Sequence, residues 1–415
     1  MPGELTVEQQ TARDAVVSRA LGTRDLQVLT GPGGSGKSFV MSAVADRLKV
    51  EGWCTLFATM SHSALASCPL QQPRLVLAKL IVQCGWKGHP NKTPAERKIA
   101  QWFRSTRRVL VVDEAFQLRA DYIQKLFSAL QGYSSVVRGG VRVILVGDPG
   151  QMKPIGGEPI TKHPDVARAK WTRLTSGTMR MTADWAQDVA SFDQNALFAD
   201  ASLGRHRRQF PRPGAMIITP TRKDAIDATR RYLAGPQAVT ILPTVPESGE
   251  GTDPPTSEVR KASEPFICDP EQAARLVYNV RDADGARTTP SGFGLNNNSR
   301  VRFAGLVDKD GDHIAIAPGA TVRLTKEMRV RIRVEGEDEP IQLAPVVVDD
   351  IVAVPLRPYG VKTVHAAQGE TIDGGVFLHA TGPVKQSVYV TAAGRVRCAE
   401  KFSVSPEVTS VQAEN

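Results

Sequence analysis

The sequence predicts an α/β protein with two lobes, each built on a doubly wound parallel sheet, and a small β insert in the second lobe. Three observations support this prediction. Short apolar runs alternate with helical stretches through residues 1–150, the same order of strand and helix returns at 214–233, and short β-prone runs fill 295–350. At 415 residues the chain is also too long for one ordinary core, so two or more lobes are expected.

The first lobe is expected to span residues 1–175. The stretch "LTVEQQTARDAVVSRA" predicts a helix, because its apolar residues recur on one side. Four strand candidates follow it, namely "DLQVLT", "WCTLFATMSH", "RRVLVVDEA" and "VRVILVGD". Their apolar runs are continuous rather than alternating, which is typical of strands buried on both faces of a parallel sheet.

The second lobe is expected to comprise residues 176–294 and 351–415. The run "GAMIITPTRKDAIDATRRYL" at 214–233 predicts a strand followed by a helix. Further strands are predicted near the end of the chain, in "GVKTVHAAQGETIDGGVFLHA" and "SVYVTAAGRV". A segment rich in Pro, Ser and Gly at about 235–265 predicts an exposed loop. The runs at 295–350 alternate with turn residues, which predicts a small barrel-like insert.

Composition restricts the partners and the cellular compartment. Lys and Arg total 52 against 43 Asp and Glu, and the net charge of +9 favours a polyanionic partner. The five cysteines include no C-x-x-C pair and leave one over, which indicates free thiols rather than a zinc site or a disulfide framework. We see neither a signal peptide nor a membrane span, so a soluble protein of the cytoplasm or nucleus is expected.

The most specific motif is "GPGGSGKS", which matches G-x-x-x-x-G-K-S between a predicted strand and a predicted helix. Its glycines let backbone N–H groups surround phosphates, and the helix N-terminus adds its positive end. The lysine can reach the outer phosphates and the final serine can ligate Mg²⁺. The predicted nucleotide-binding residues are Gly31, Gly33, Gly34, Ser35, Gly36, Lys37 and Ser38.

Polar residues follow two further buried strands at the same edge of the predicted sheet. "VVDEAFQL" places Asp113, a candidate Mg²⁺ ligand, beside Glu114, a candidate base for the attacking water. "VGDPGQMKP" places Gln151 where an amide can contact a γ-phosphate or that water. A motor that hydrolyses nucleotide needs such a glutamate, whereas a nucleotide kinase does not.

The ordered set of motifs resembles a superfamily 1 helicase. "LTVEQQ", "GPGGSGKS", "FATMSHSALA", "VVDEAFQL", "GDPGQMKPI", "LTSGTMRMTADW", "VKTVHAAQGETID" and "YVTAAGRVRCAEKF" follow the family's order over nearly the whole chain. The resemblance implies two RecA-like lobes with ATP·Mg²⁺ in the cleft between them. The stretch "VPLRPYGVK" and the position of the β insert are similar to the 5′-to-3′ branch of RecD-like and Dda-like helicases, which carry an SH3-like module there.

Family roles follow from the matched positions. Gln9 resembles the residue that reads adenine, and Arg180 and Arg395 resemble the arginines that the second lobe directs at the γ-phosphate. In "AAGRVR" an alignment needs one extra residue, and Arg395 is chosen over Arg397. Such arginines accelerate phosphoryl transfer by about 10³ to 10⁵.

Nucleic-acid contacts also follow from the resemblance. The motif T-x-H-x-x-Q-G implies that Thr363 and His365 meet nucleic acid and that Gln368 and Gly369 lie toward the phosphates. The family's lysine before the glutamine is absent, because Ala366 and Ala367 stand there. Further candidates are Ser61 and His62, together with three basic runs, "RSTRR" at 104–108, "RHRRQFPRP" at 205–213 and "RLTKEMRVRIR" at 323–333.

The expected function is an ATP-dependent helicase or translocase that moves 5′-to-3′ on single strands. DNA is favoured over RNA because of the β insert, and a monomer is expected. An RNA helicase of a viral replication machinery is the first alternative, since "VDEAFQL" and "TVHAAQGET" are equally similar to those enzymes. A P-loop phosphotransferase and a degenerate nucleic-acid-binding scaffold are the others.

Overall fold

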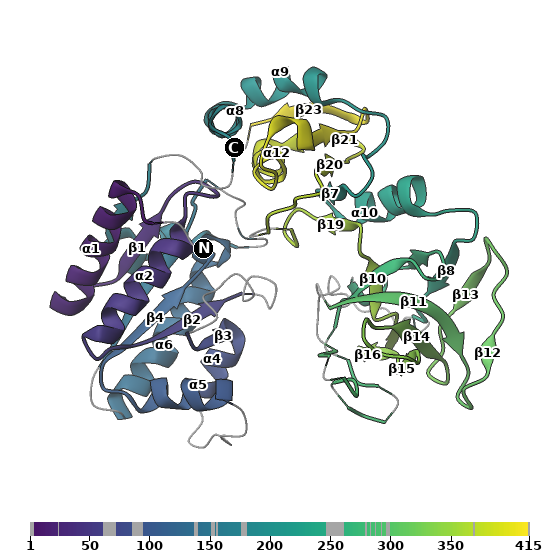
Figure 1. Cartoon of the computed structure of the whole chain (residues 1–415), viewed down its shortest axis with the longest axis horizontal. Helices are drawn as coiled ribbons and strands as arrows, with labels where there is room; N and C mark the ends of the chain where they lie inside the picture. The colour runs from purple at the N-terminus through teal and green to yellow at the C-terminus, as the bar shows by residue number, and fades with distance from the viewer. Residues whose placement is uncertain are drawn as a thin grey trace.

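The computed structural model of the chain forms three bodies (Figure 1). It describes residues 4–413 except 24, 61–71, 85–93, 137–139, 151–153, 155–156, 176–180, 246–260, 279, 283, 287, 292, 296–298 and 368–369. The first lobe lies at the left of Figure 1, the second lobe at the top and a β-rich region at the right. No helix among the described residues is long and apolar enough to cross a membrane.

The first lobe contains a six-stranded, fully parallel sheet. Its order is β3 (Arg74–Val76), β2 (Cys54–Thr59), β4 (Arg108–Val112), β5 (Val141–Gly147), β1 (Gln27–Thr30) and β6 (Lys170–Arg173). The helices are α1 (Val7–Gly22), α2 (Lys37–Val50), α4 (Leu77–Cys84), α5 (Pro94–Arg104), α6 (Ala120–Val136) and α7 (Pro164–Ala167), with short 3₁₀ turns η1 (Ala115–Gln117) and η2 (Ile160–Lys162). The four predicted strands are confirmed.

Both faces of this sheet are buried, as the continuous apolar runs predicted. Leu29, Val111 and Ile144 pack with α1 and α2 in one core. Their chain neighbours point the other way, and Val28 and Leu110 pack with α4 and α6 in a second core. The parallel arrangement brings the carboxyl ends of β1, β4 and β5 to one edge, where the predicted motifs follow the strands.

The second lobe has a four-stranded parallel sheet in the order β19 (Val361–Thr363), β7 (Met216–Thr219), β20 (Val376–Leu378) and β22 (Phe402–Val404). The helices are α8 (Ala183–Gln194), α9 (Ala196–His206), α10 (Arg222–Ala228), which continues into the π-helical turn η3 (Thr229–Leu233), and α12 (Gln386–Ala393). The 3₁₀ turn η4 (Ala399–Lys401) and a parallel pair, β21 (Gly382–Lys385) with β23 (Val408–Gln412), complete the lobe.

The prediction of a strand for "SVYVTAAGRV" is wrong, because most of this segment is helix α12. Residues from Ser387 to Ala393 are all buried, so the helix has no polar face. A helix that is apolar all round lacks the 3.6-residue periodicity by which helices are recognised, and its β-branched residues favour a strand.

The β-rich region contains a sheet in the order β15 (Ile341–Leu343), β14 (Arg329–Arg333), β11 (Arg300–Val307), β10 (Ala273–Leu276) and β18 (Leu356–Pro358), with β12 (His313–Ile314) on β11. A second sheet pairs β13 (Thr321–Arg323), β8 (Val239–Leu242) and β9 (Phe266–Cys268), and β16 (Val346–Val348) pairs with β17 (Ile351–Ala353). One apolar core runs from Val239 to Leu356 and so exceeds the predicted insert at 295–350.

Strand β8 also falls inside the loop predicted at 235–265. It pairs with β13, some 80 residues later in the chain, and such long-range pairing leaves no local signal in the sequence. Residues 246–260 of that loop lie outside the described part of the chain.

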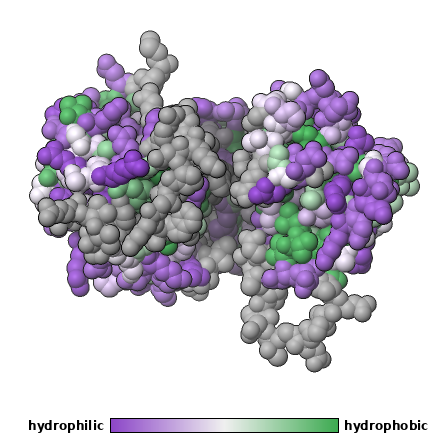
Figure 2. Space-filling view, turned by 90° about the horizontal axis from the view of Figure 1, so that it is seen from below, coloured by the Kyte–Doolittle hydropathy of each residue, from purple (hydrophilic) through white to green (hydrophobic). Residues whose placement is uncertain are grey.

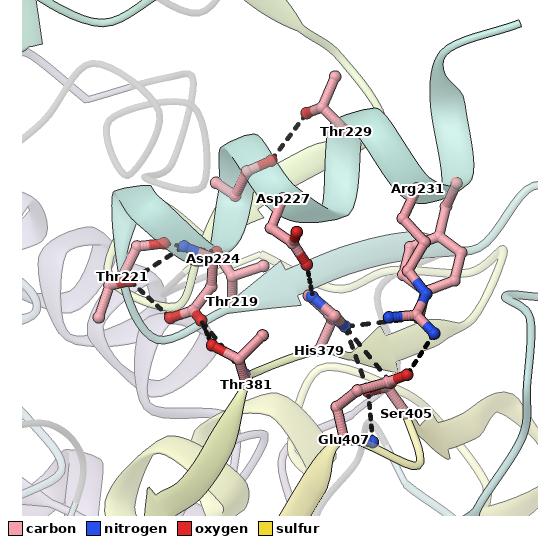
Figure 3. A network of polar contacts seen from close by, with 12 residues as sticks. Thr219, Thr221, Asp224, Asp227, Thr229, Arg231, His379, Thr381, Ser405 and Glu407 are labelled. Atoms are coloured by element: carbon pink, nitrogen blue, oxygen red, sulfur yellow. Dashed lines mark hydrogen bonds and ion pairs between the residues drawn. The ribbon is translucent and has the colours of Figure 1, made fainter.

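A buried polar network connects α10 to the ends of β20 and β22 in the second lobe (Figure 3). The imidazole of His379, which is 0% exposed, lies 3.0 Å from the Asp227 carboxylate and 3.1 Å from the Ser405 hydroxyl. Glu407 accepts a hydrogen bond from Ser405 and forms an ion pair with Arg231. These groups satisfy one another, so we assign them a structural role at the ends of β20 and β22.

Candidate active site between the two lobes

The phosphate loop begins directly after β1 and ends at the first turn of α2. Gly34 and Gly36 have φ values of 85° and 83°, a left-handed conformation that glycine adopts without the strain of a Cβ atom. Gly31 lies so close to its surroundings that a Cβ there would be 2.7 Å from the Ser35 Oγ and 2.9 Å from the Leu174 Cβ. Glycine is thus favoured at Gly34 and Gly36 by the backbone conformation and at Gly31 by the lack of space for a side chain.

Lys37 and Ser38 occupy the start of α2, as the motif predicted. The Lys37 ammonium donates to the carbonyls of Gly31 and Pro32, at 2.7 and 2.9 Å. The Ser38 hydroxyl donates to a carboxylate oxygen of Asp113 at 3.2 Å. A hydroxyl and a carboxylate at this separation are a suitable ligand pair for Mg²⁺, whose remaining ligands come from phosphates and water.

Asp113 and Glu114 follow β4, beside the phosphate loop. Burial and, to a lesser extent, the Glu114 charge raise the pKa of Asp113 to about 6, although hydrogen bonds and the Lys37 charge act in the opposite direction. Glu114 has a φ of 53°, a conformation that is unfavourable for a residue other than glycine. Its carboxylate accepts a hydrogen bond from Gln117 at 3.3 Å.

A cavity of about 720 Å³ joins the two lobes at this edge. Gly31 and Gly33 line it from the first lobe, and Thr391 and Arg395 line it from the second. This volume is within the range of small-molecule sites. The phosphate loop and the predicted second-lobe arginine therefore border the same space.

Arg395 is 2% exposed, and its guanidinium donates to the carbonyls of Thr391 and Glu370 at 3.0 and 3.4 Å. Arg397, the other candidate, is 55% exposed at its side chain and forms an ion pair with Asp373 at 2.9 Å. Of the two, Arg395 is the one that lines the cavity. This placement favours the choice of Arg395.

Gln9 lies behind the phosphate loop. It is 3% exposed, its amide donates to the Ser35 carbonyl at 3.0 Å, and it forms a capping box with Thr6 at the start of α1. In this geometry Gln9 braces the loop. Its predicted contact with adenine stays a prediction.

Thr363 and His365 lie at the carboxyl end of β19, beside the end of β7. Both are half-buried, and burial lowers the pKa of His365. The His365 Nε2 atom is buried and has no hydrogen-bond partner among the described residues. Neither residue lines the cavity, so their predicted contact with nucleic acid concerns a separate surface.

A short chain of contacts links this segment to the cavity. The Lys362 ammonium lies 2.8 Å from both carboxylate oxygens of Glu370, and the Glu370 carbonyl accepts the bond from Arg395. Lys362 is 5% exposed and the Glu370 side chain is 27% exposed, so the ion pair is partly shielded from solvent. The strand that leads to Thr363 is thus connected to the guanidinium that borders the cavity.

Six predicted residues lie outside the described part of the chain, namely Ser61, His62, Gln151, Arg180, Gln368 and Gly369. Asp193, at the end of α8, was not predicted from the sequence, and it lines the cavity near Asp148. Burial and the Asp148 charge raise the pKa of Asp193 to about 6. No motif marks this residue, because its position depends on how the lobes pack.

Residues 4–192 match the AAA domain family. The chain is similar to a Pif1 helicase structure concerned with DNA unwinding at forked double-stranded DNA by two coordinating Pif1 helicases (15% identity, 97% of this chain and 92% of that chain, TM-score 0.64). It is also similar to Bacteroides Pif1 bound to ssDNA (15% identity, 97% and 92%, TM-score 0.62).

Another similar structure is Pif1 helicase from Bacteroides in complex with ADP-AlF3 and ssDNA (15% identity, 99% and 95% coverage, TM-score 0.61). No curated protein matches the chain at a significant level. At these identities the likeness concerns the fold. The predicted resemblance to superfamily 1 helicases is confirmed at that level: the chain has the two-lobed fold of the Pif1 helicases, with a match to the AAA domain family over residues 4–192.

Proposed function

We propose that the chain is an ATP-dependent helicase or translocase that moves 5′-to-3′ along single-stranded DNA and uses Mg²⁺. One observation carries the proposal: the phosphate loop of one lobe and a buried arginine of the other, Arg395, border a single cavity. The similar Pif1 structures include complexes with ssDNA and with ADP-AlF3, which agrees with this function.

The residues of the first lobe fit a nucleotide with Mg²⁺. The left-handed glycines turn backbone N–H groups inward, and Lys37 can exchange its two loop carbonyls for the outer phosphates. Ser38 and Asp113 would hold Mg²⁺, which neutralises charge on the phosphates. Among the described residues no cluster of three or more His, Cys, Asp or Glu offers another metal site.

Hydrolysis then requires a base and a counter-charge. We assign Glu114 as the base that takes a proton from the attacking water, since it directly follows Asp113 at the end of β4. Arg395 supplies positive charge from the opposite wall, and Arg180 is proposed to do the same. The Gln151 amide is proposed to contact the γ-phosphate or the attacking water. Closure of the lobes completes the site, and reopening after hydrolysis moves the lobes along the strand.

The proposed strand is DNA, and its proposed contacts include Thr363, His365, Ser61 and His62. The proposed place of action is the cytoplasm or nucleus. The test is steady-state ATP hydrolysis with equal nucleotide concentrations of single-stranded DNA or RNA, with Lys37→Ala as the blank. Stimulation by DNA alone is the expected result. Equal or greater stimulation by RNA would make RNA the proposed substrate in place of DNA. The absence of stimulation by either nucleic acid would contradict the translocase function.

A further inference from the structure

The β-rich region carries an arginine-covered sheet face that the active site does not use. The strands β11 and β14 read "RVRF" and "RVRIR", so apolar and arginine residues alternate along both. Val301, Phe303, Val330 and Ile332 point into the core. The arginines point to the other side, and we call this set the arginine face: Arg300, Arg302, Arg329, Arg331 and Arg333.

Strand register places these arginines next to one another. Arg302 is directly opposite Arg333 across β11 and β14. At the inner border of the face, Arg275 is opposite Arg300 on one side and Arg357 on the other. Like charges that face each other across a sheet are destabilising, so a sheet without a partner gains nothing from this arrangement.

Acidic residues compensate only the border of the face. Glu271 pairs with Arg333 at 2.9 Å, and Glu264 pairs with Arg357 at 3.0 Å. Arg302 donates to a backbone carbonyl at 3.0 Å, and neither Arg302 nor Arg331, on the adjacent strand, forms an ion pair with a residue that the structure describes. Charge therefore remains available in the middle of the face. In the view from below, hydrophilic side chains make up most of the visible surface of this region (Figure 2).

The arginine face is continuous with the second lobe. The Arg300 guanidinium lies over the ring of Tyr359, 4.7 Å from its centroid, and the Lys362 ammonium lies 5.7 Å from the same centroid. Lys362 directly precedes Thr363, which is expected to meet the single strand. Lys362 itself is buried and paired with Glu370, so Tyr359 and Arg300 are the residues that connect this segment to the arginine face.

The form of the face decides between two kinds of nucleic acid. Single strands are held in grooves with free aromatic rings on which bases stack, but the Tyr359 ring is already covered by Arg300. The arginines spread over neighbouring strands of a sheet, which lie about 4.8 Å apart. A broad array of guanidinium groups suits the backbone of a duplex, with about one charge per 1.7 Å of its axis.

We propose that the arginine face binds the phosphate backbone of double-stranded DNA, without reading its sequence. The proposal rests on the proposed function for its choice of partner, because a protein that opens duplexes meets both a strand and a duplex. Arg302 and Arg331 are the central contacts, and guanidinium groups donate to phosphate oxygens in pairs.

The test compares the double variant Arg302→Gln/Arg331→Gln with the wild-type chain. Binding of a blunt 20-base-pair DNA duplex and of a 20-nucleotide single strand is measured without nucleotide over a range of salt concentrations. We expect duplex affinity to fall about tenfold and the slope of log K against log salt to decrease by about 1.8, the value for two lost phosphate contacts. Single-strand binding should change far less.

Two further variants control for charge and folding. Arg47→Gln/Arg168→Gln removes the same charge from exposed positions of the first lobe and should bind the duplex like wild type. Arg302→Lys/Arg331→Lys keeps the charge and should retain the wild-type slope. Thermal unfolding should show no loss of stability in any variant, because no buried contact is removed.

An unchanged duplex slope in the glutamine variant would overturn the proposal, as would an equal loss in the first-lobe control. An equal decrease for the single strand would reassign the face to strand binding and also contradict it. ATP hydrolysis of the wild-type chain with single-stranded DNA is measured in parallel. If single-stranded DNA did not stimulate hydrolysis, the proposed function would be contradicted. The duplex-binding measurements would still test the arginine face independently.

Discussion

The two walls of the interlobe cavity differ in how far they are assembled. On the first-lobe side, the left-handed glycines of the loop and the Ser38–Asp113 pair beside it already have the geometry that a nucleotide with Mg²⁺ requires, and Lys37 has only to exchange two loop carbonyls for phosphates. On the second-lobe wall, Arg395 is held by carbonyls of its own lobe. The difference indicates a division of labour in which one wall binds the nucleotide and the other makes hydrolysis depend on closure.

The largest expected effect concerns the binding wall. Lys37→Ala should abolish stable ATP binding and lower hydrolysis by at least about 10³-fold, since it removes the charge that faces the outer phosphates. Binding is measured with a fluorescent ATP analogue and hydrolysis by phosphate release. Lys49→Ala, at the other end of the same helix, is the control and should behave like wild type. Tight ATP binding by the Lys37 variant would contradict the assignment of nucleotide binding to the first-lobe wall.

The next effect concerns the buried carboxylate. Asp113→Asn should lower hydrolysis by about 10²-fold or more, because a Mg²⁺ ligand is lost. The same variant should be more stable than wild type at pH 7 to 8, by on the order of 1–3 kcal/mol. The reason is that wild type must keep a buried carboxylate ionised there.

The pH dependence of that gain follows from the direction of the shift. Because the pKa of Asp113 is raised to about 6, the folded state holds this proton more tightly than the unfolded chain does. The free energy of unfolding of the wild type therefore decreases as pH rises from about 4 to about 6, because the unfolded chain releases this proton more readily. The difference in free energy of unfolding between Asp113→Asn and wild type, measured with urea, should therefore become smaller below pH 6. A difference independent of pH would contradict the assigned cause.

A smaller effect is expected from the loop backbone. In Gly31→Ala the new Cβ would meet the Ser35 Oγ at 2.7 Å and the Leu174 Cβ at 2.9 Å. Overpacking of this kind costs about 1–3 kcal/mol, and we expect it to raise the KM for ATP. Gly22→Ala is the matched control, because a Cβ there meets nothing within 4 Å. Equal behaviour of the two variants would mean that the loop is more adaptable than its geometry indicates.

The smallest effect concerns the brace behind the loop. Gln9→Ala removes one half of a capping box and the bond to the Ser35 carbonyl. A loss of about 1 kcal/mol in stability is expected, with a modest rise in the KM for ATP. Gln10→Ala, at an exposed position of the same helix, is the control. If affinity for GTP and ATP converges in the Gln9 variant, the residue also reads adenine.

The sequence sufficed for the elements that local patterns determine. Buried strands with continuous apolar runs were predicted, and the phosphate loop was placed between β1 and α2, because motif and strand order together are specific. Helix α12 was missed because it is buried on every side. The extent of the β-rich region depends on pairing such as β8 with β13, and the contribution of Asp193 depends on lobe packing. Such contacts link distant parts of the chain, so a local pattern does not contain them.

If the second wall acts in hydrolysis and not in ATP binding, Arg395→Ala should separate these two properties. ATP affinity and kcat are measured for this variant and for Arg397→Ala, whose exposed side chain pairs with Asp373. We expect nearly unchanged ATP affinity and a loss of about 10³-fold or more in kcat for Arg395→Ala, with little change for Arg397→Ala. Equal loss of affinity and kcat in the Arg395 variant, or full activity, would contradict this expectation.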